Sequence, residues 1–344
     1  MDVESLPIVV VLDSGVIFPE TLSSLITKKW IAPGSSGGDG DHGTKVASRI
    51  AFKYINQQLP SPTITPRTRI IDCNILDGMV PINIFIQRIQ DAVNEFCTIS
   101  SIYNLSANSD SPIEGDEMSI VGYELDVLQK RNGVLFFVSA GNHSLWETES
   151  SLENILDDDD SRIAAPADSM LAVTVGSIIG ADYENSLSQK YDIAPYSRRG
   201  PGFMGLLKPD LCAYAGTITV NAGVPHIPSD SFSLLMSKEG KLVPDVGTSF
   251  SAPVVAGDFA EIMGIVPDHN ILLTKALLYH NAMPVWDEES ITEDELAFAH
   301  RLYGRGISNV DRSKYSSPSC VTFVRTGTLN RTTKERVLIY MPTF

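Results

Sequence analysis

The stretch Ile8-Val-Val-Val-Leu-Asp-Ser-Gly15 decides how this chain folds. Five consecutive apolar residues make a run of strand length, and the Asp-Ser-Gly that follows ends it. A short run that is apolar at every position predicts a strand buried on both faces, as in a parallel sheet. Comparable strand candidates recur at residues 68–73, 102–106, 133–139 and 170–176.

Segments of helix length separate these runs. Residues 81–96 carry apolar side chains near a 3.6-residue period, and residues 42–50 and 117–131 are further helix candidates. Alternating strands and helices predict an α/β fold, a mostly parallel central β-sheet with helices on both faces. Polar stretches between them are predicted as insertions: an acidic surface loop at 144–161, and loops or hairpins at 181–197 and 227–246.

The pattern changes near the C-terminus. Residues 1–310 are predicted to form one domain. Residues 311–344 are predicted as a short β-rich tail that begins a further module, because Thr and Val alternate in Cys320-Val-Thr-Phe-Val and Val337-Leu-Ile-Tyr.

Composition and charge exclude several functions. The 344 residues hold 26 Lys and Arg against 42 Asp and Glu, a formal net charge of −16. This acidity argues against binding of nucleic acid, which needs clustered cations, and against docking to an anionic membrane. No apolar run approaches the roughly 18–20 residues that cross a bilayer.

The cysteines and the N-terminus indicate the compartment. Cys73, Cys97, Cys212 and Cys320 form no CxxC pair and are expected to be free thiols in a reducing environment. The first residues lack the basic and apolar segments of a signal peptide. The expected localisation is cytoplasmic.

Four polar residues stand where an α/β sheet gathers its chemistry, beyond the carboxyl ends of strands or at helix starts. Asp13 follows the first strand, His42 opens a helix after a glycine-rich loop, and Asn142 follows the fourth predicted strand. Ser249 lies in Gly-Thr-Ser-Phe-Ser-Ala-Pro, whose small residues permit a tight turn. Taken singly, each is better explained as a turn, loop or capping residue; jointly they supply a nucleophile, a base, a carboxylate and an oxyanion donor.

In this order, Val-Leu-Asp13-Ser-Gly, Asp-His42-Gly-Thr, Ser-Ala-Gly-Asn142 and Gly-Thr-Ser249-Phe-Ser-Ala-Pro resemble the subtilisin-like serine proteases, or subtilases. The resemblance runs from about residue 7 to 280, and implies a subtilisin-like fold whose catalytic domain is residues 1–310. It further implies that Asp13, His42 and Ser249 form a catalytic triad, with Asn142 in the oxyanion hole. The residues expected to line the substrate groove are Ser106, Ala107, Asn108, Val138, Ser139, Ala140 and Gly141.

The chain also departs from the family pattern. Asn108 stands where subtilases usually have glycine, and its added bulk is expected to narrow the groove. Only twelve residues precede Asp13, which implies either an intracellular subtilase without a prodomain or a chain whose N-terminal part is missing. The stretch between Asn142 and Ser249 is long for the family, so its loops are expected to restrict access.

The resemblance therefore implies a serine endopeptidase that acts on polypeptides, without a partner nucleic acid or membrane. The alternative is a latent or inactive subtilase fold that binds peptides or serves as a regulatory module. No cofactor is expected, and no metal site is predicted. Structural calcium at residues 157–160 stays open, although four successive Asp residues lack the spacing of a built site. A regulatory domain or partner protein is expected to restrain the activity.

Overall fold

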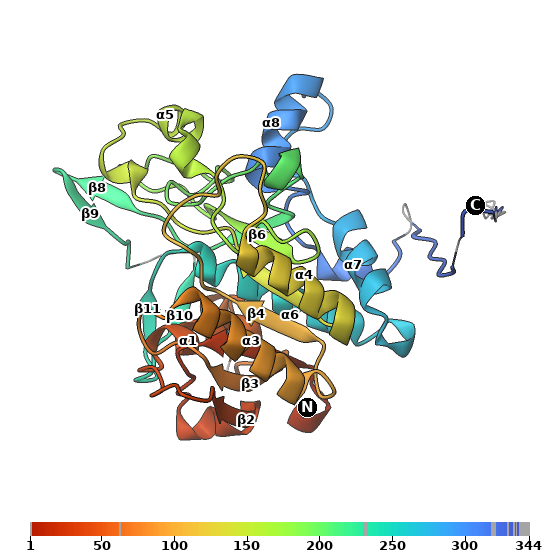
Figure 1. Cartoon of the computed structure of the whole chain (residues 1–344). Coiled ribbons are helices and arrows are strands. Elements are labelled where there is room, and N and C mark those ends of the chain that lie inside the picture. Colours follow the sequence, from red (N-terminus) through yellow and green to blue (C-terminus); the bar gives the residue numbers. More distant parts are fainter. Residues whose placement is uncertain are drawn as a thin grey trace.

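The computed structural model describes residues 2–61, 63–229, 233–317, 321–328, 330–332, 334 and 336. A parallel seven-stranded sheet with strand order β2-β3-β1-β4-β5-β6-β7 forms the centre of the molecule (Figure 1). Its strands are β1 (Ile8–Asp13), β2 (Ile26–Ile31), β3 (Arg69–Asn74), β4 (Ile102–Leu105), β5 (Leu135–Ser139), β6 (Val173–Ile178) and β7 (Leu211–Tyr214).

Helices cover both faces of this sheet, which confirms the predicted α/β architecture. The described helices are α1 (Asp41–Phe52), α2 (Ile55–Gln58), α3 (Ile82–Phe96), α4 (Ile120–Asn132), α5 (Leu152–Asp157), α6 (Ala252–Met263), α7 (Ile271–His280), α8 (Glu293–Tyr303) and α9 (Val310–Lys314). None of the described helices is both long enough and apolar enough to traverse a lipid bilayer.

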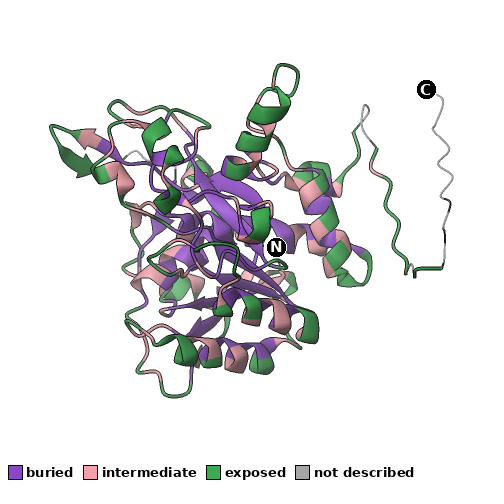
Figure 2. Cartoon of the chain, turned by 45° about the horizontal axis from the view of Figure 1, so that its top comes forward, coloured by how far each residue is buried: buried purple, intermediate pink, exposed green. Residues whose placement is uncertain are grey.

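The period-two alternation of a strand divides the core into two layers. Val9 and Val11 of β1 pack in the layer that contains α1 and α6. Val10 and Leu12 point the other way, into the layer formed with α3 and α4. Every one of these four side chains is fully buried, and Figure 2 shows buried residues concentrated in the central strands. The uniformly apolar run is therefore explained by burial on both faces.

Some elements differ from the sequence-based expectations. The edge strand β2 and the short strand β7 were not predicted, and the stretch 144–161 contains helix α5 where a plain loop was expected. A hairpin, β10 (Leu234–Met236) with β11 (Leu242–Pro244), does lie in the stretch 227–246, and a second one, β8 (Thr219–Asn221) with β9 (Val224–His226), precedes it.

The predicted β-rich tail is only partly within the described chain. Residues 321–328 form neither helix nor strand, whereas Cys320 and the stretch 337–340 lie outside the described residues. Its β character stays a prediction. Cys73, Cys97 and Cys212 are free thiols, as expected.

A buried ion cluster links α6 to the end of α1. Asp258 of α6 is fully buried and accepts hydrogen bonds from Arg67, from Ser308 (2.6 Å) and from Lys53 (3.1 Å), the residue that follows α1. Burial alone would raise the pKa of Asp258, but the charges of Lys53 and Arg67 outweigh it, so the pKa is lowered. The carboxylate thus stays ionised and holds the two helices together.

Candidate active site

The fold brings the four candidate residues to one edge of the sheet. Asp13 is the last residue of β1, and Asn142 lies just beyond β5. Because all seven strands are parallel, their carboxyl ends meet at the same edge. His42 is the second residue of α1, and Ser249 lies in a short 3-10 turn (Thr248–Phe250) immediately before α6.

Asp13 and His42 are in direct contact. The Nδ1 atom of His42 lies 2.9 Å from Oδ1 and 3.0 Å from Oδ2 of Asp13, and because a carboxylate only accepts, Nδ1–H is the donor. Asp13 is 1% exposed, whereas the His42 side chain keeps 40% of its surface accessible. The carboxylate is therefore shielded, and Nε2 is left as the free nitrogen of the ring.

The surroundings of His42 favour its charged form. Burial lowers the pKa of His42, but the charge and hydrogen bond of Asp13, with the charge of Asp245, outweigh burial and raise the pKa. Lys45 opposes this rise, and it is itself paired with Asp245 at 3.0 Å. A histidine held in this way is a stronger base than an isolated imidazole.

A glycine permits the close approach of α1 to β1. A Cβ atom at Gly43 would lie 2.2 Å from the carbonyl oxygen of Gly15 and 3.2 Å from Cβ of Asp13. Real side chains essentially never approach a carbonyl this closely. The glycine after His42 is therefore required for the helix start to lie against the end of β1, which sets the Asp13–His42 distance.

Ser249 follows Thr248 in the turn before α6, and its hydroxyl is bonded to the segment after β4. Its neighbour Phe250 packs against the His42 ring with centroids 5.5 Å apart. The Ser249 hydroxyl donates to the carbonyl oxygen of Ser106 at 3.3 Å, and the Ser106 hydroxyl donates back to the Ser249 carbonyl at 2.9 Å. Among the residues that the structure describes, no hydrogen bond joins Ser249 to His42.

Asn142 is oriented by Thr248. Its Oδ1 accepts hydrogen bonds from the Thr248 backbone N–H (2.9 Å) and hydroxyl (3.2 Å). The same hydroxyl accepts from the backbone N–H of Gly141 at 3.1 Å. These two donors fix the orientation of the amide, so that Nδ2 lies on the side away from Thr248. Asn142 is exposed.

The predicted groove residues fall into two groups. Ser106 contacts Ser249, and Asn108 reaches across to the opposite segment; Ala107 lines an apolar cavity. By contrast, Val138 and Ala140 are fully buried in the apolar core between sheet and helices. Ser139 and Gly141 are buried as well. Their contact with a substrate stays a prediction.

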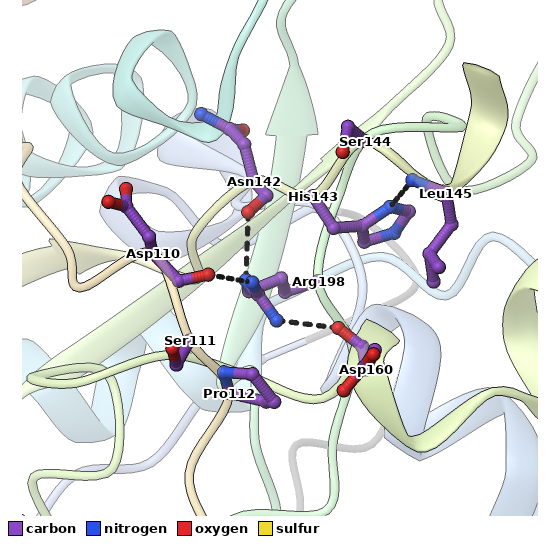
Figure 3. A pocket seen from close by; sticks show the side chains of 9 residues that line it. All are labelled: Asp110, Ser111, Pro112, Asn142, His143, Ser144, Leu145, Asp160 and Arg198. Carbon is purple, nitrogen blue, oxygen red and sulfur yellow. Dashed lines mark hydrogen bonds between the residues drawn. The ribbon is translucent and has the colours of Figure 1, made fainter.

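Two cavities flank the segment that follows β4. The first, of about 540 Å³, is lined by residues 110–112, residues 142–145, Asp160 and Arg198 (Figure 3). The stretch 144–161 contributes both of its ends to this cavity. The second, of about 440 Å³, is mostly apolar and lies between this segment and the start of α3, with Phe85 and Val121 among its walls.

The His143 side chain in the first cavity differs electrostatically from His42. Burial, together with the charge of Arg198, lowers the pKa of His143 to about 4. It is therefore neutral near pH 7, and its Nδ1 accepts a hydrogen bond from the Leu145 backbone at 3.3 Å. This histidine is a wall of the cavity and carries no charge there.

Sequence reasoning missed several residues that act at this edge. Thr248 lies within the quoted Gly-Thr-Ser motif, so its position was visible, but its bond to Asn142 was not. Phe250 lies in the same motif, but its contact with the His42 ring was not predicted, and Asp245 influences His42 from a position that no pattern in the sequence marks. Arg198 directly follows the stretch 181–197, which was predicted only as a loop or hairpin.

Comparisons with known proteins identify the family of this chain. The model of the subtilase family matches residues 7–309. The serine protease AprX of Bacillus subtilis is 25% identical over 291 residues, which are 80% of this chain and 58% of that protein. The protein y4bN of Sinorhizobium fredii is 26% identical over 234 residues, 61% of this chain and 54% of that protein. The chain thus spans little more than half the length of these relatives.

A solved structure shows the same fold. The patellamide maturation protease PatA superposes with a TM-score of 0.57 at 20% identity, over 90% of this chain and 96% of that one. The family model covers most of the chain and includes all four motifs that predicted it. The chain therefore belongs to the subtilase family of serine peptidases.

Proposed function

We propose that this chain is a serine endopeptidase in which Ser249 is the nucleophile, His42 the general base and Asp13 the group that orients His42. The observation that carries the proposal is the two-oxygen contact of Asp13 with Nδ1 of His42, at the edge where Ser249 and Asn142 also lie. This contact fixes the tautomer in which Nε2 is free to accept a proton.

The reaction follows from these positions. Ser249 Oγ forms a bond to the peptide carbonyl carbon while its proton passes to Nε2 of His42. The oxyanion accepts hydrogen bonds from Nδ2 of Asn142 and from the backbone N–H of Ser249. His42 then returns the proton to the leaving nitrogen as the C–N bond breaks. Water, deprotonated by His42, attacks the acyl carbon, the bond to Ser249 Oγ breaks, and Ser249 takes the proton back from His42. Asp13 stays ionised throughout.

Substrate binding would also align the nucleophile. In the free chain the Ser249 hydroxyl donates to the Ser106 carbonyl. An extended peptide that adds as a strand needs main-chain acceptors of this kind for its own N–H groups. Once a peptide N–H takes the Ser106 carbonyl, the hydroxyl loses this acceptor, and Nε2 of His42 is the acceptor that the proposal assigns to it.

The test is labelling of Ser249 by a fluorophosphonate probe, together with hydrolysis of a peptide amide. Ser249→Ala should abolish labelling, and both Ser249→Ala and His42→Ala should lower kcat by about 10⁶-fold, without adding in the double variant, because the residues act as a unit. Ser150→Ala, at an exposed serine, is the matched control and should retain both signals. An unlabelled wild-type chain would support the alternative, a silent peptide-binding module.

A further inference from the structure

The gap beside the reacting groups separates two chain segments. One segment is residues 106–112, which follows β4 and includes the Ser106 carbonyl next to Ser249. The other is residues 139–142, which ends at Asn142. In the proposed reaction Ser249 attacks a carbonyl held by Asn142, and the side chain of the residue that owns this carbonyl would enter the gap that lies between these two segments. The inference below rests on the proposed peptidase function.

Asn108 crosses this gap. Its Nδ2 donates to the Ser139 carbonyl oxygen at 2.8 Å and, at 3.4 Å, to that of Ala164. In return the Ser139 hydroxyl donates to Oδ1 of Asn108 at 2.5 Å. Ser139 and Ala164 are fully buried, so these bonds hold the Asn108 side chain at the inner end of the gap. A glycine at this position would leave that space open.

Arg198 crosses the gap a second time. Its Nε donates to the Asn142 carbonyl at 2.8 Å, and its Nη2 donates to the Asp110 carbonyl at 2.6 Å, so one guanidinium joins the two segments (Figure 3). Nη1 donates to the carbonyls of Asp160 (2.6 Å) and Arg162 (2.8 Å). Arg198 is 2% exposed and forms the floor of the 540 Å³ cavity.

These contacts line the gap with polar groups. A large apolar side chain could reach the inner end of the gap only by displacing Asn108, which would leave the Ser139 hydroxyl and the Asn108 amide without these partners in a buried place. It would also cover the charged guanidinium of Arg198, which donates hydrogen bonds to main-chain carbonyls. A methyl or hydroxymethyl group meets neither obstacle.

We propose that Asn108 and Arg198 determine specificity, and that they restrict the residue before the scissile bond to a small side chain, such as that of Gly, Ala or Ser. The recognition of larger apolar side chains is left to the 440 Å³ cavity that Ala107 and Asn108 line together with Phe85 and Val121, where an upstream part of the peptide would lie.

The experiment compares two peptide amides that differ only in Ala or Phe before the scissile bond. The wild-type chain should cleave the Ala peptide with a kcat/KM at least about tenfold higher than the Phe peptide, a discrimination within reach of pocket shape alone. Asn108→Gly opens the gap and should raise the Phe-to-Ala ratio of kcat/KM at least about tenfold. Asn185→Gly, at an exposed loop position with a φ of 61°, is the matched control and should leave this ratio unchanged.

A second variant tests the same contact without opening the gap. Ser139→Ala removes the hydroxyl that holds Oδ1 of Asn108, and should raise the Phe-to-Ala ratio by less than Asn108→Gly does. Circular dichroism confirms that each variant is folded. This inference would be overturned if the wild-type chain cleaved both peptides with similar kcat/KM, or if neither variant changed the Phe-to-Ala ratio of kcat/KM. Cleavage of the peptides would in that case still support the proposed peptidase function. Absence of both cleavage and fluorophosphonate labelling would overturn the two together.

Discussion

Replacing Gly43 by alanine should separate His42 from Asp13. The added Cβ would lie 2.2 Å from the Gly15 carbonyl oxygen, whereas ordinary contact begins near 3.4 Å, so the helix start must move away by about 1.2 Å. The same shift applied to the Asp13–His42 contact of 2.9 Å lengthens it to about 4 Å, which is no longer a hydrogen bond. We expect kcat/KM to fall by about 100-fold, the usual cost of an ångström of misplacement.

The pH profile distinguishes this effect from general damage. The charge and hydrogen bond of Asp13 raise the pKa of His42, whereas burial lowers it. Moving the ring away from Asp13 weakens the first effect and leaves the second, so the pKa of His42 should fall. The acid limb of kcat/KM against pH should therefore shift to lower pH in Gly43→Ala. Gly264→Ala is the control, because its Cβ meets only a carbonyl at 3.4 Å and another at 3.8 Å. A variant with normal kcat/KM and an unmoved acid limb would refute the reasoning.

Three other outcomes are expected. In the wild-type chain the acid limb of kcat/KM against pH should have its midpoint above pH 6.5, because the pKa of His42 is raised. Asp245→Asn removes one of the charges that raise this pKa and should move the midpoint to lower pH. An unchanged midpoint in this variant would contradict the assignment. Thr248→Val removes one of the two hydrogen bonds to Asn142 Oδ1 and should lower kcat about tenfold at similar KM. This loss is smaller than the roughly 10²–10³-fold loss for removing an oxyanion donor, because the Thr248 backbone N–H still holds Asn142. Asp258→Ala should lower the free energy of unfolding in urea by about 3 kcal/mol, the lower end for breaking a buried ion pair, since Lys53 loses its carboxylate and Arg67 keeps only Glu261 as an anionic partner.

The sequence predicted the interior of the sheet better than its margins. β1 is buried on both faces, so the run Ile8-Val-Val-Val-Leu12 is apolar at every position and is easily recognised as a central strand. β2 pairs only with β3, and most of Ile26-Thr-Lys-Lys-Trp-Ile31 is exposed, so its charged residues conceal the strand. Helix α5 has only six residues, and its inward-facing Leu152, Ile155 and Leu156 make a single turn of apolar spacing, which is too short to stand out within an acidic stretch; the helix depends on the Ser151 cap and on tertiary packing.

The candidate site divides in the same way. The positions of Asp13, His42, Asn142 and Ser249 follow from strand ends and helix starts, which local sequence specifies. The bonds of Asn108 depend on which rotamer spans a gap between segments that are distant in the chain, and no local pattern encodes this. The sequence indicated that Asn108 would narrow the groove, but its partner across the gap came only from the structure.

The link between α1 and α6 has a consequence for how such a chain can diversify. His42 and Ser249 lie at the starts of these helices, and Asp258 joins α6 to Lys53 just after α1, inside the core. The packing of the two helices therefore sets the distance between His42 and Ser249. The surface stretch 144–161 can change in length or charge without resetting that distance, while it alters the wall of the cavity to which its ends contribute. Mutations in the stretch 144–161 could thus change which peptides bind without changing the arrangement of His42 and Ser249.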